Sequence, residues 1–269
     1  MAASFPNILY HYTTSSVLLS IVRHRSIWLC SRWHLNDYEE GGLFNRFVRE
    51  IAARDNFAEE RTDEVVDVLE AGDFFVSCLT SSRDALSQWR GYAANGAGVC
   101  IGFDTELLLE MLKGQSEMLL YPVTYADSAS ALRADVQDLI PKILASNGEP
   151  GIGFLQSLLK ERWSVKGTAF AEEAEYRLIL TPTPAPGELH GPKRIELRMD
   201  VEAELKFRAT DTGIRDYYEM SFPAGLLSRL LREVKLGPRN DSNEQVLRRM
   251  LNEAGLGSTR VGRSNASYR

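Results

Sequence analysis

The sequence predicts a single α+β domain with a mixed or antiparallel sheet and helical insertions. Strand-like and helical runs occur in groups along the chain, and this grouping argues against a doubly wound parallel sheet. The length of 269 residues, 44% of them hydrophobic and 25% charged, is that of one large globular domain. No internal repeat and no long linker interrupts the sequence, so we expect residues 1–269 to fold as one domain.

The first elements are expected to be a strand, a helix and a second strand. Residues 7–12 form an apolar run, and Thr14 or Ser15 would cap the helix that follows. Residues 26–31 would form the second strand, and Asp37 is the candidate N-cap of the next helix.

The central part is expected to place two strands around a short helix. The strands are predicted at 74–80 and 96–104, and "SRDALSQWRGYA" between them would be a helix capped by Ser82 or Asp84. Gly102 leaves one face of the second strand bare, which permits close approach of a ligand or of another backbone. Helical spacing then predicts three helices, at 105–113, 128–146 and 150–163.

The C-terminal part is expected to add strands and two helices. Strands are predicted at 175–180, at 195–201, where apolar and polar residues alternate, and at 216–222. The closing elements would be the helix "AGLLSRLLREV", the strand "KLG", a helix capped by Asp241 or Ser242 and a terminal strand.

The reactive side chains exclude several classes of function. Cys30, Cys78 and Cys100 are widely spaced in apolar runs, which predicts buried, reduced thiols and a cytoplasmic location. The four histidines lack metal-ligand spacing, and neither a phosphate-binding glycine motif nor a nucleophile elbow occurs, so we expect no metal site. No apolar run has the length of a membrane span, and the start lacks a signal-peptide pattern, so we expect no membrane partner.

Two segments carry opposite charge. Leu35 to Asp73 contains twelve acids and four bases, a balance of −8, whereas Ser228 to Arg269 contains nine bases and four acids, a balance of +5. Solvated helix faces explain both segments, and docking of a nucleic acid or an acidic partner on the basic end is the alternative.

The first group of residues that could carry chemistry lies at the junction of the first strand and helix. His11 and Thr13 share one strand face, and both can hydrogen-bond to sugar hydroxyls. Tyr12 points the other way. The alternative interpretation is a structural strand end with Tyr12 in the core.

The second group lies in "LSQWRGYAANGAGVCIGF". Arg90 has Trp89 and Tyr92 beside it, and a guanidinium near two flat rings suits a ligand with a phosphate and a heteroaromatic ring. A core tryptophan beside an arginine that reaches out to solvent is the alternative.

The third group lies in "FAEEAEYRLIL". Glu175 and Arg177 share one face of a strand, so the arginine could orient a carboxylate that points into a pocket. Glu173 could play the same part if the strand begins earlier. The alternative is an edge strand with a solvated ion pair, worth well under about 1 kcal/mol.

Several motifs together resemble an uncharacterised bacterial family, the domain-of-unknown-function 2971 family. The motifs are "LYHYT", "IWLCSRWHLND", "LSQWRGYAANGAGVCIGFD", "FAEEAEYRLIL", "LGPR" and "SNASYR". The resemblance spans nearly the whole chain, and the family name implies no activity.

The opening "YHYT" strand and the helix "LLSIVRHRSIWL" are also similar to the start of the ADP-ribosyltransferase superfamily, which includes nucleic-acid-modifying toxins. This resemblance implies a split sheet and NAD as a substrate. It implies that His11 holds the nicotinamide ribose, that Trp89 or Tyr92 stacks on a ring, and that Glu175 steadies the sugar cation. An alternative place for the aromatic element is "SRWHLND", with Trp33, His34 and Asn36.

Two functional hypotheses follow. In the first, the protein transfers ADP-ribose from NAD to a nucleic acid or protein acceptor, with Glu175 stabilising the developing positive charge and Arg90 or Arg177 holding the pyrophosphate. The resemblance implies a toxin or anti-phage defence setting for this activity, with an antitoxin as a partner. In the second, the same pocket belongs to a non-catalytic module that binds a nucleotide or a partner protein.

Overall fold

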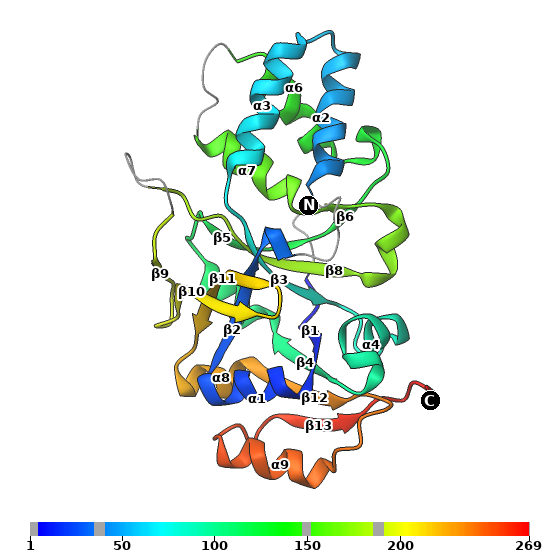
Figure 1. Ribbon diagram of the computed structural model, residues 1–269, viewed down its shortest axis with the longest axis vertical. Coiled ribbons are helices and arrows are strands. Elements are labelled where there is room, and N and C mark those ends of the chain that lie inside the picture. Colours follow the sequence, from blue (N-terminus) through cyan, green and yellow to red (C-terminus); the bar gives the residue numbers. More distant parts are fainter. Residues whose placement is uncertain (1–4, 35–40, 147–151, 185–190, 269) are drawn as a thin grey trace.

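The computed structural model describes residues 5–34, 41–146, 152–184 and 191–268. Its centre is an 11-stranded sheet with helices on its faces, and a helical unit lies beyond one end of this sheet (Figure 1). The predicted α+β class is therefore confirmed.

The sheet is mixed, as expected. Neighbouring strands are antiparallel except for β12 and β13, which run parallel. The strand order is β13-β12-β4-β1-β3-β2-β11-β10-β9, with β8 and β5 attached beside β3. The strands are β1 (Ile8–Thr13), β2 (Ser26–Ser31), β3 (Phe75–Thr80), β4 (Val99–Asp104), β5 (Met118–Pro122), β8 (Glu175–Leu180), β9 (Arg194–Glu196), β10 (Glu202–Thr210), β11 (Gly213–Ser221), β12 (Leu231–Leu236) and β13 (Arg260–Arg263), and a separate small sheet pairs β6 (Thr124–Tyr125) with β7 (Val165–Lys166).

Strand β3 has β8 along one of its edges and both β1 and β2 along the other. Strand β8 pairs with the whole of β3, from Thr80↔Glu175 to Phe75↔Leu180. The opposite edge is shared, because β1 pairs with β3 at Tyr10↔Thr80 and β2 pairs with it at the other end. Strands β1 and β2 therefore diverge from one another along this edge of β3.

Helices cover the sheet around the largest apolar core. Helix α1 (Ser15–His24) begins at Thr14, whose side chain accepts a hydrogen bond from Val17 N, as the sequence predicts. This core joins α1 to the buried faces of β1, β4 and β12 and includes Leu9, Ile101 and Val234. The other helices near the sheet are α4 (Leu86–Tyr92), α5 (Thr105–Leu112), α8 (Ala224–Leu230) and α9 (Glu244–Glu253).

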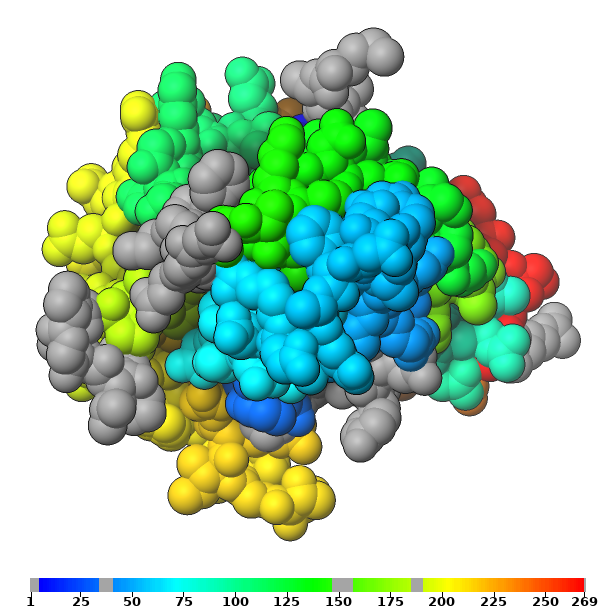
Figure 2. Space-filling view, turned by 90° about the horizontal axis from the view of Figure 1, so that it is seen from above, coloured from blue at the N-terminus to red at the C-terminus, as the bar shows by residue number. Residues whose placement is uncertain are grey.

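The helical unit has an apolar core of its own. It consists of α2 (Gly42–Arg54) and α3 (Glu59–Ala71), inserted between β2 and β3, and of α6 (Ala134–Leu144) and α7 (Ile152–Arg162), inserted between β6 and β7. Phe44, Leu69 and Ile140 pack together in this second core. Seen from above, the surfaces of these helices adjoin one another (Figure 2). The Asp37 cap predicted for the first of them lies outside the described residues.

Several predicted elements differ in the structure. The predicted strand 195–201 ends early, because Met199 and Asp200 adopt positive φ angles and turn the chain into β10, which the sequence analysis did not anticipate. The predicted helix "AGLLSRLLREV" ends at Leu230, because its second half pairs with β4 as β12. Helix α4 starts after Ala85 without a side-chain cap.

Candidate functional site

A cavity of about 500 Å³ lies where β1 and β2 diverge. We call it the cleft. It is lined by residues from β1, β2, β3, α1, α4, β8 and β10, and by the short helix η4 (Thr168–Glu173). By strand alternation, Glu175 shares a sheet face with Thr80, whereas His11 lies on the opposite face. Both side chains nevertheless line the cleft, because the cavity lies at the gap between the diverging strands.

His11 presents one free nitrogen to the cleft. Its Nδ1 lies 2.9 Å from the carbonyl oxygen of Cys78, which can only accept, so Nδ1 carries a proton and donates it. Burial lowers the pKa of His11, although the bond to Cys78 opposes this shift. The imidazole is therefore neutral near pH 7, and Nε2 remains as a hydrogen-bond acceptor.

The two residues that follow His11 also line the cleft, but Tyr12 has its hydroxyl occupied. This hydroxyl donates to Ser82 O at 3.0 Å and accepts from Ala85 N at 3.1 Å. Tyr12 therefore anchors the segment that leads into α4. Thr13 is buried at the end of β1 and lines the cleft beside it.

Glu175 is a buried carboxylate held by two cations. Arg177 donates to it through Nε at 2.9 Å and through its second terminal nitrogen at 3.2 Å, and Lys166 Nζ lies 2.9 Å away. Burial by itself raises the pKa of Glu175, but Arg177 and Lys166 outweigh burial and bring the pKa to about 2. The carboxylate is therefore ionised at neutral pH.

The environment of this pair corrects two expectations. Strand β8 lies between β3 and β5, and the side chains of Glu175 and Arg177 are only 5% and 1% exposed, so the pair is not a solvated pair on an edge strand. Arg177 is buried behind Glu175, donates to Trp163 O and does not line the cleft. Arg177 therefore positions the Glu175 carboxylate. The expectation that Arg177 contacts a ligand is wrong, because its side chain does not reach the cleft.

Glu173 provides a second carboxylate. It accepts a hydrogen bond from the hydroxyl of Tyr92 at 2.6 Å and another from Lys166 at 2.7 Å. Lys166 therefore links Glu173 and Glu175, and its ammonium lies 5.2 Å from the ring of Phe170, which also lines the cleft. At 14% exposure, the side chain of Glu173 is the more accessible of the two carboxylates.

Helix α4 contributes different residues from those expected. Gln88 and Tyr92 line the cleft. Trp89 is completely buried and donates through Nε1 to Asp84 at 2.7 Å, so the expectation that it stacks on a ligand is corrected. Arg90 is exposed and does not line the cleft, so the expectation that it holds a phosphate there is corrected too.

The opposite wall was missed by the sequence analysis. Trp28 of β2 and Arg208 of β10 line the cleft, with the guanidinium 5.0 Å from the indole ring. Among the residues that the structure describes, Arg208 forms no ion pair with a carboxylate. Trp28 lies in the predicted strand 26–31, so the alternation of side chains along that strand could have indicated that it faces a cavity. The strand that carries Arg208 was not predicted.

The remaining candidates lie elsewhere. Trp33 is exposed at 69% and stacks with Arg32 at 4.1 Å, whereas Asn36 lies outside the described residues. The three cysteines form no disulfide with one another, and Cys100 is buried as expected. The expectation of burial is wrong for Cys78, which is exposed in the cleft.

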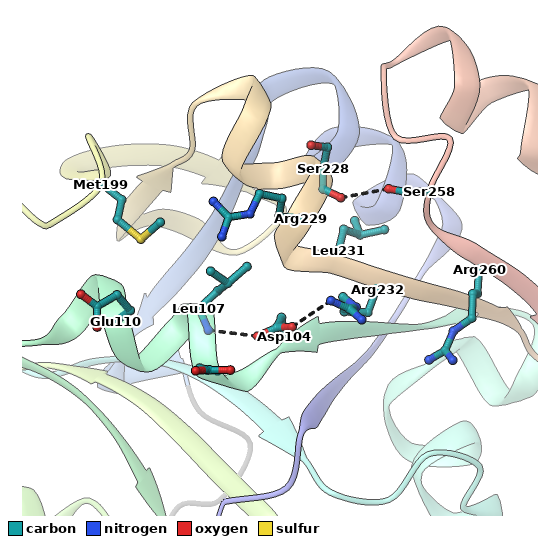
Figure 3. A pocket seen from close by; sticks show the side chains of 11 residues that line it. Asp104, Leu107, Glu110, Met199, Ser228, Arg229, Leu231, Arg232, Ser258 and Arg260 are labelled. Carbon is teal, nitrogen blue, oxygen red and sulfur yellow. Dashed lines mark hydrogen bonds and ion pairs between the residues drawn. The ribbon is translucent and has the colours of Figure 1, made fainter.

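A second, larger cavity of about 800 Å³ lies between α5, α8 and β12 (Figure 3). Two of its arginines pair with carboxylates, Arg232 with Asp104 at 3.1 Å and Arg260 with Glu233 at 3.4 Å. None of the predicted site residues lines it, so the cleft is the better candidate for chemistry.

Comparisons with known proteins find one matching family model. Residues 88–178, less than half of the chain, match the model described as "Protein of unknown function (DUF2971)". The match runs from Gln88 to the middle of β8 and includes Lys166, Glu173 and Glu175. No curated protein and no solved structure matches the chain.

The described ranges lack two further features. No helix there combines the length and apolar character of a membrane span. No group of three or more histidine, cysteine or acidic side chains in those ranges is placed to hold a metal ion.

Proposed function

We propose that the protein cleaves NAD in the cleft and transfers ADP-ribose to a macromolecular acceptor. The observation that supports this most is that His11 of β1 and the paired carboxylates Glu173 and Glu175 line one cavity, although they lie far apart in the sequence. The resemblance of the "YHYT" opening to ADP-ribosyltransferases points the same way.

The chemistry needs a fixed negative charge. Breaking the bond between nicotinamide and ribose leaves the electron pair on the nicotinamide nitrogen and positive charge on the sugar. Glu175, ionised and held by Arg177, is a preorganised group that would stabilise this charge. The acceptor nucleophile then bonds to the sugar carbon, and the more accessible Glu173 would take the proton that the nucleophile loses.

The other lining residues suit the rest of the dinucleotide. Nε2 of His11 would accept a hydrogen bond from a ribose hydroxyl. The rings of Trp28, Tyr92 and Phe170 offer flat surfaces, and Arg208 would contact the pyrophosphate in place of Arg90. A cytoplasmic toxin or phage-defence setting, with an antitoxin as partner, rests on the sequence resemblance alone.

A binding module is the second candidate. The observation that favours it is that two cations already compensate Glu175, as in a structural ion pair. Such a module would bind NAD or a related nucleotide without turnover.

The test is the release of nicotinamide from NAD by wild type, Glu175→Gln and Glu172→Gln, with cell extract as the source of acceptor. Glu172 is the control, because it lies exposed in η4, three residues before Glu175, and does not line the cleft. Loss of one preorganised electrostatic group costs about a hundredfold or more in rate, so Glu175→Gln should lose this much and Glu172→Gln should keep the wild-type rate.

Two results would contradict the proposal. Equal rates in wild type and Glu175→Gln would remove Glu175 as the catalytic group and leave Glu173. Binding of NAD without release by any of the proteins would favour the module. A thermal melt of each variant shows that the fold is retained.

A further inference from the structure

The basic charge of this protein is concentrated at one end. The segment from Ser228 to Arg269 has a balance of +5, so the rest of the chain, with 22 bases and 33 acids, has a balance of −11. The acidic segment from Leu35 to Asp73 lies largely in the helical unit, at the opposite end of the molecule from β13 and α9 (Figure 1). A polyanion would therefore be attracted to the C-terminal end and repelled from the helical unit.

A cluster of one ring and two arginines lies on this end beside α4. The guanidinium of Arg90 lies 5.9 Å from the ring centre of Tyr268, and that of Arg239 lies 5.8 Å from it. Both arginines are exposed, and within the described part of the chain neither pairs with a carboxylate. We call these three residues the Arg90–Tyr268–Arg239 cluster.

The C-terminal segment is fixed by its own hydrogen bonds. Asp84 accepts from Ser264 Oγ at 2.6 Å and from Asn265 N at 2.9 Å, and it also holds Lys235 and Trp89. Tyr268 donates its hydroxyl proton to Asn95 at 2.6 Å. The two guanidinium groups are therefore presented on an ordered surface, which limits the entropy lost when an anion binds.

The cluster also lies close to the cleft. Arg90 and Tyr92 belong to the same short helix, and Tyr92 lines the cleft and bonds to Glu173. Two residues apart on a helix, their side chains project about 200° apart, so Arg90 points away from the cleft across a helix about 10 Å wide. A strand bound at the cluster would therefore have to pass around α4 to bring a nucleotide to the cleft.

We propose that the Arg90–Tyr268–Arg239 cluster binds the phosphate backbone of a single-stranded nucleic acid. This inference rests on the proposed function, because the bound nucleic acid would be the acceptor of ADP-ribose in that reaction. A single strand is required, because a base inside a duplex is stacked and cannot enter a cavity without leaving the helix. Arginine suits this role, because its planar fork binds phosphate oxygens bidentately.

The test measures binding without NAD. Fluorescence anisotropy follows a labelled single strand of mixed sequence titrated with wild type, with Arg90→Gln/Arg239→Gln and with Arg54→Gln. Arg54 is the control, because it is an exposed arginine of the acidic helical unit. Each phosphate contact to a single strand contributes about 0.7 to the slope of log K against log salt. The double variant should therefore bind at least about tenfold more weakly, with a slope smaller by roughly 1.4, while Arg54→Gln should match wild type.

Three results would overturn the inference. They are unchanged binding by the double variant, a preference of wild type for a duplex of the same sequence, and competition by poly-glutamate as strong as by unlabelled strand, which would indicate an acidic protein partner. Because the assay contains no NAD, these results are independent of turnover. Failure of nicotinamide release with intact strand binding would instead count against the proposed function alone.

Discussion

The two walls of the cleft are built in different ways. The first wall, formed by β1, β3, β8 and η4, is dense with interactions, and its Glu175 is buried and bonded to Arg177 and Lys166. The second wall, formed by β2 and β10, carries Trp28 and Arg208, which are partly exposed and contact one another through a cation–ring interaction. The first wall is therefore fixed by a buried ion pair, whereas the guanidinium of Arg208 in the second wall is held by no carboxylate of the described residues and is free to adapt to a ligand.

The largest expected effect comes from breaking the ion pair in the first wall. Arg177→Met leaves the Glu175 carboxylate buried with Lys166 as its remaining cation, and breaking a buried pair costs about 3–5 kcal/mol of unfolding free energy. Arg208→Met in the second wall should cost less than about 1 kcal/mol, because this side chain is not part of a buried pair. Urea unfolding of both variants measures the difference, and equal losses would contradict the contrast between the walls.

The second effect is a dependence of stability on acid. The pKa of Glu175 is lowered from 4.5 in the unfolded chain to about 2 in the folded protein. Its contribution is therefore complete above about pH 4.5 and is lost as the pH falls toward 2, with an upper size of about 3 kcal/mol. The free energy of unfolding, measured with urea at pH 5 and at pH 3, should decrease less for Glu175→Gln than for wild type. An identical decrease in the two proteins would mean that other carboxylates control the dependence of stability on pH.

The third effect concerns the second wall. Arg208→Gln should weaken NAD binding about tenfold, or about 1.4 kcal/mol, because a charge-assisted hydrogen bond to phosphate is lost. The rate of nicotinamide release at saturating NAD should stay the same. Arg215→Gln is the control, since Arg215 faces Arg208 across the β10–β11 pair but does not line the cleft. Isothermal titration gives the affinity, and a fall in the rate without a change in affinity would contradict the adaptable role of this wall.

The smallest effect concerns the thiols. Cys78 is exposed in the cleft, Cys30 is partly buried, and burial raises the pKa of the buried Cys100. A thiol reagent should therefore label Cys78 first and Cys100 only after unfolding. Bound NAD should slow the labelling of Cys78. Peptide mapping after short labelling shows the order, and early modification of Cys100 would contradict the packing described.

The sequence predicted the first wall better than the second. His11 and Glu175 could be found because each stands at the end of a short apolar strand, where the pattern is local. Arg208 could not be found, because β10 alternates weakly between buried and exposed residues and is held in place by pairing with β11 and β9. Its position depends on contacts between distant parts of the chain, which a local pattern does not contain.

The orientation of α4 shows the same limit. The motif "QWRGY" predicted a ligand-binding helix, but the sequence could not decide which residues face the cleft. Tertiary contacts decide this. Asp84 accepts a hydrogen bond from the indole of Trp89, and the ring of Tyr12 packs edge-to-face on that indole, with 4.8 Å between the ring centres. Trp89 is thereby turned into the core, and Tyr92 lines the cleft in its place.

The most direct test of the account is the position of the nucleotide itself. A crystal structure with a hydrolysis-resistant NAD analogue should place a ribose hydroxyl within hydrogen-bond distance of His11 Nε2. The sugar carbon that bears the nicotinamide should face the carboxylate of Glu175, with the pyrophosphate near Arg208. A nucleotide bound in the larger cavity of Figure 3, or in the cleft with its ribose turned away from both residues, would contradict the account.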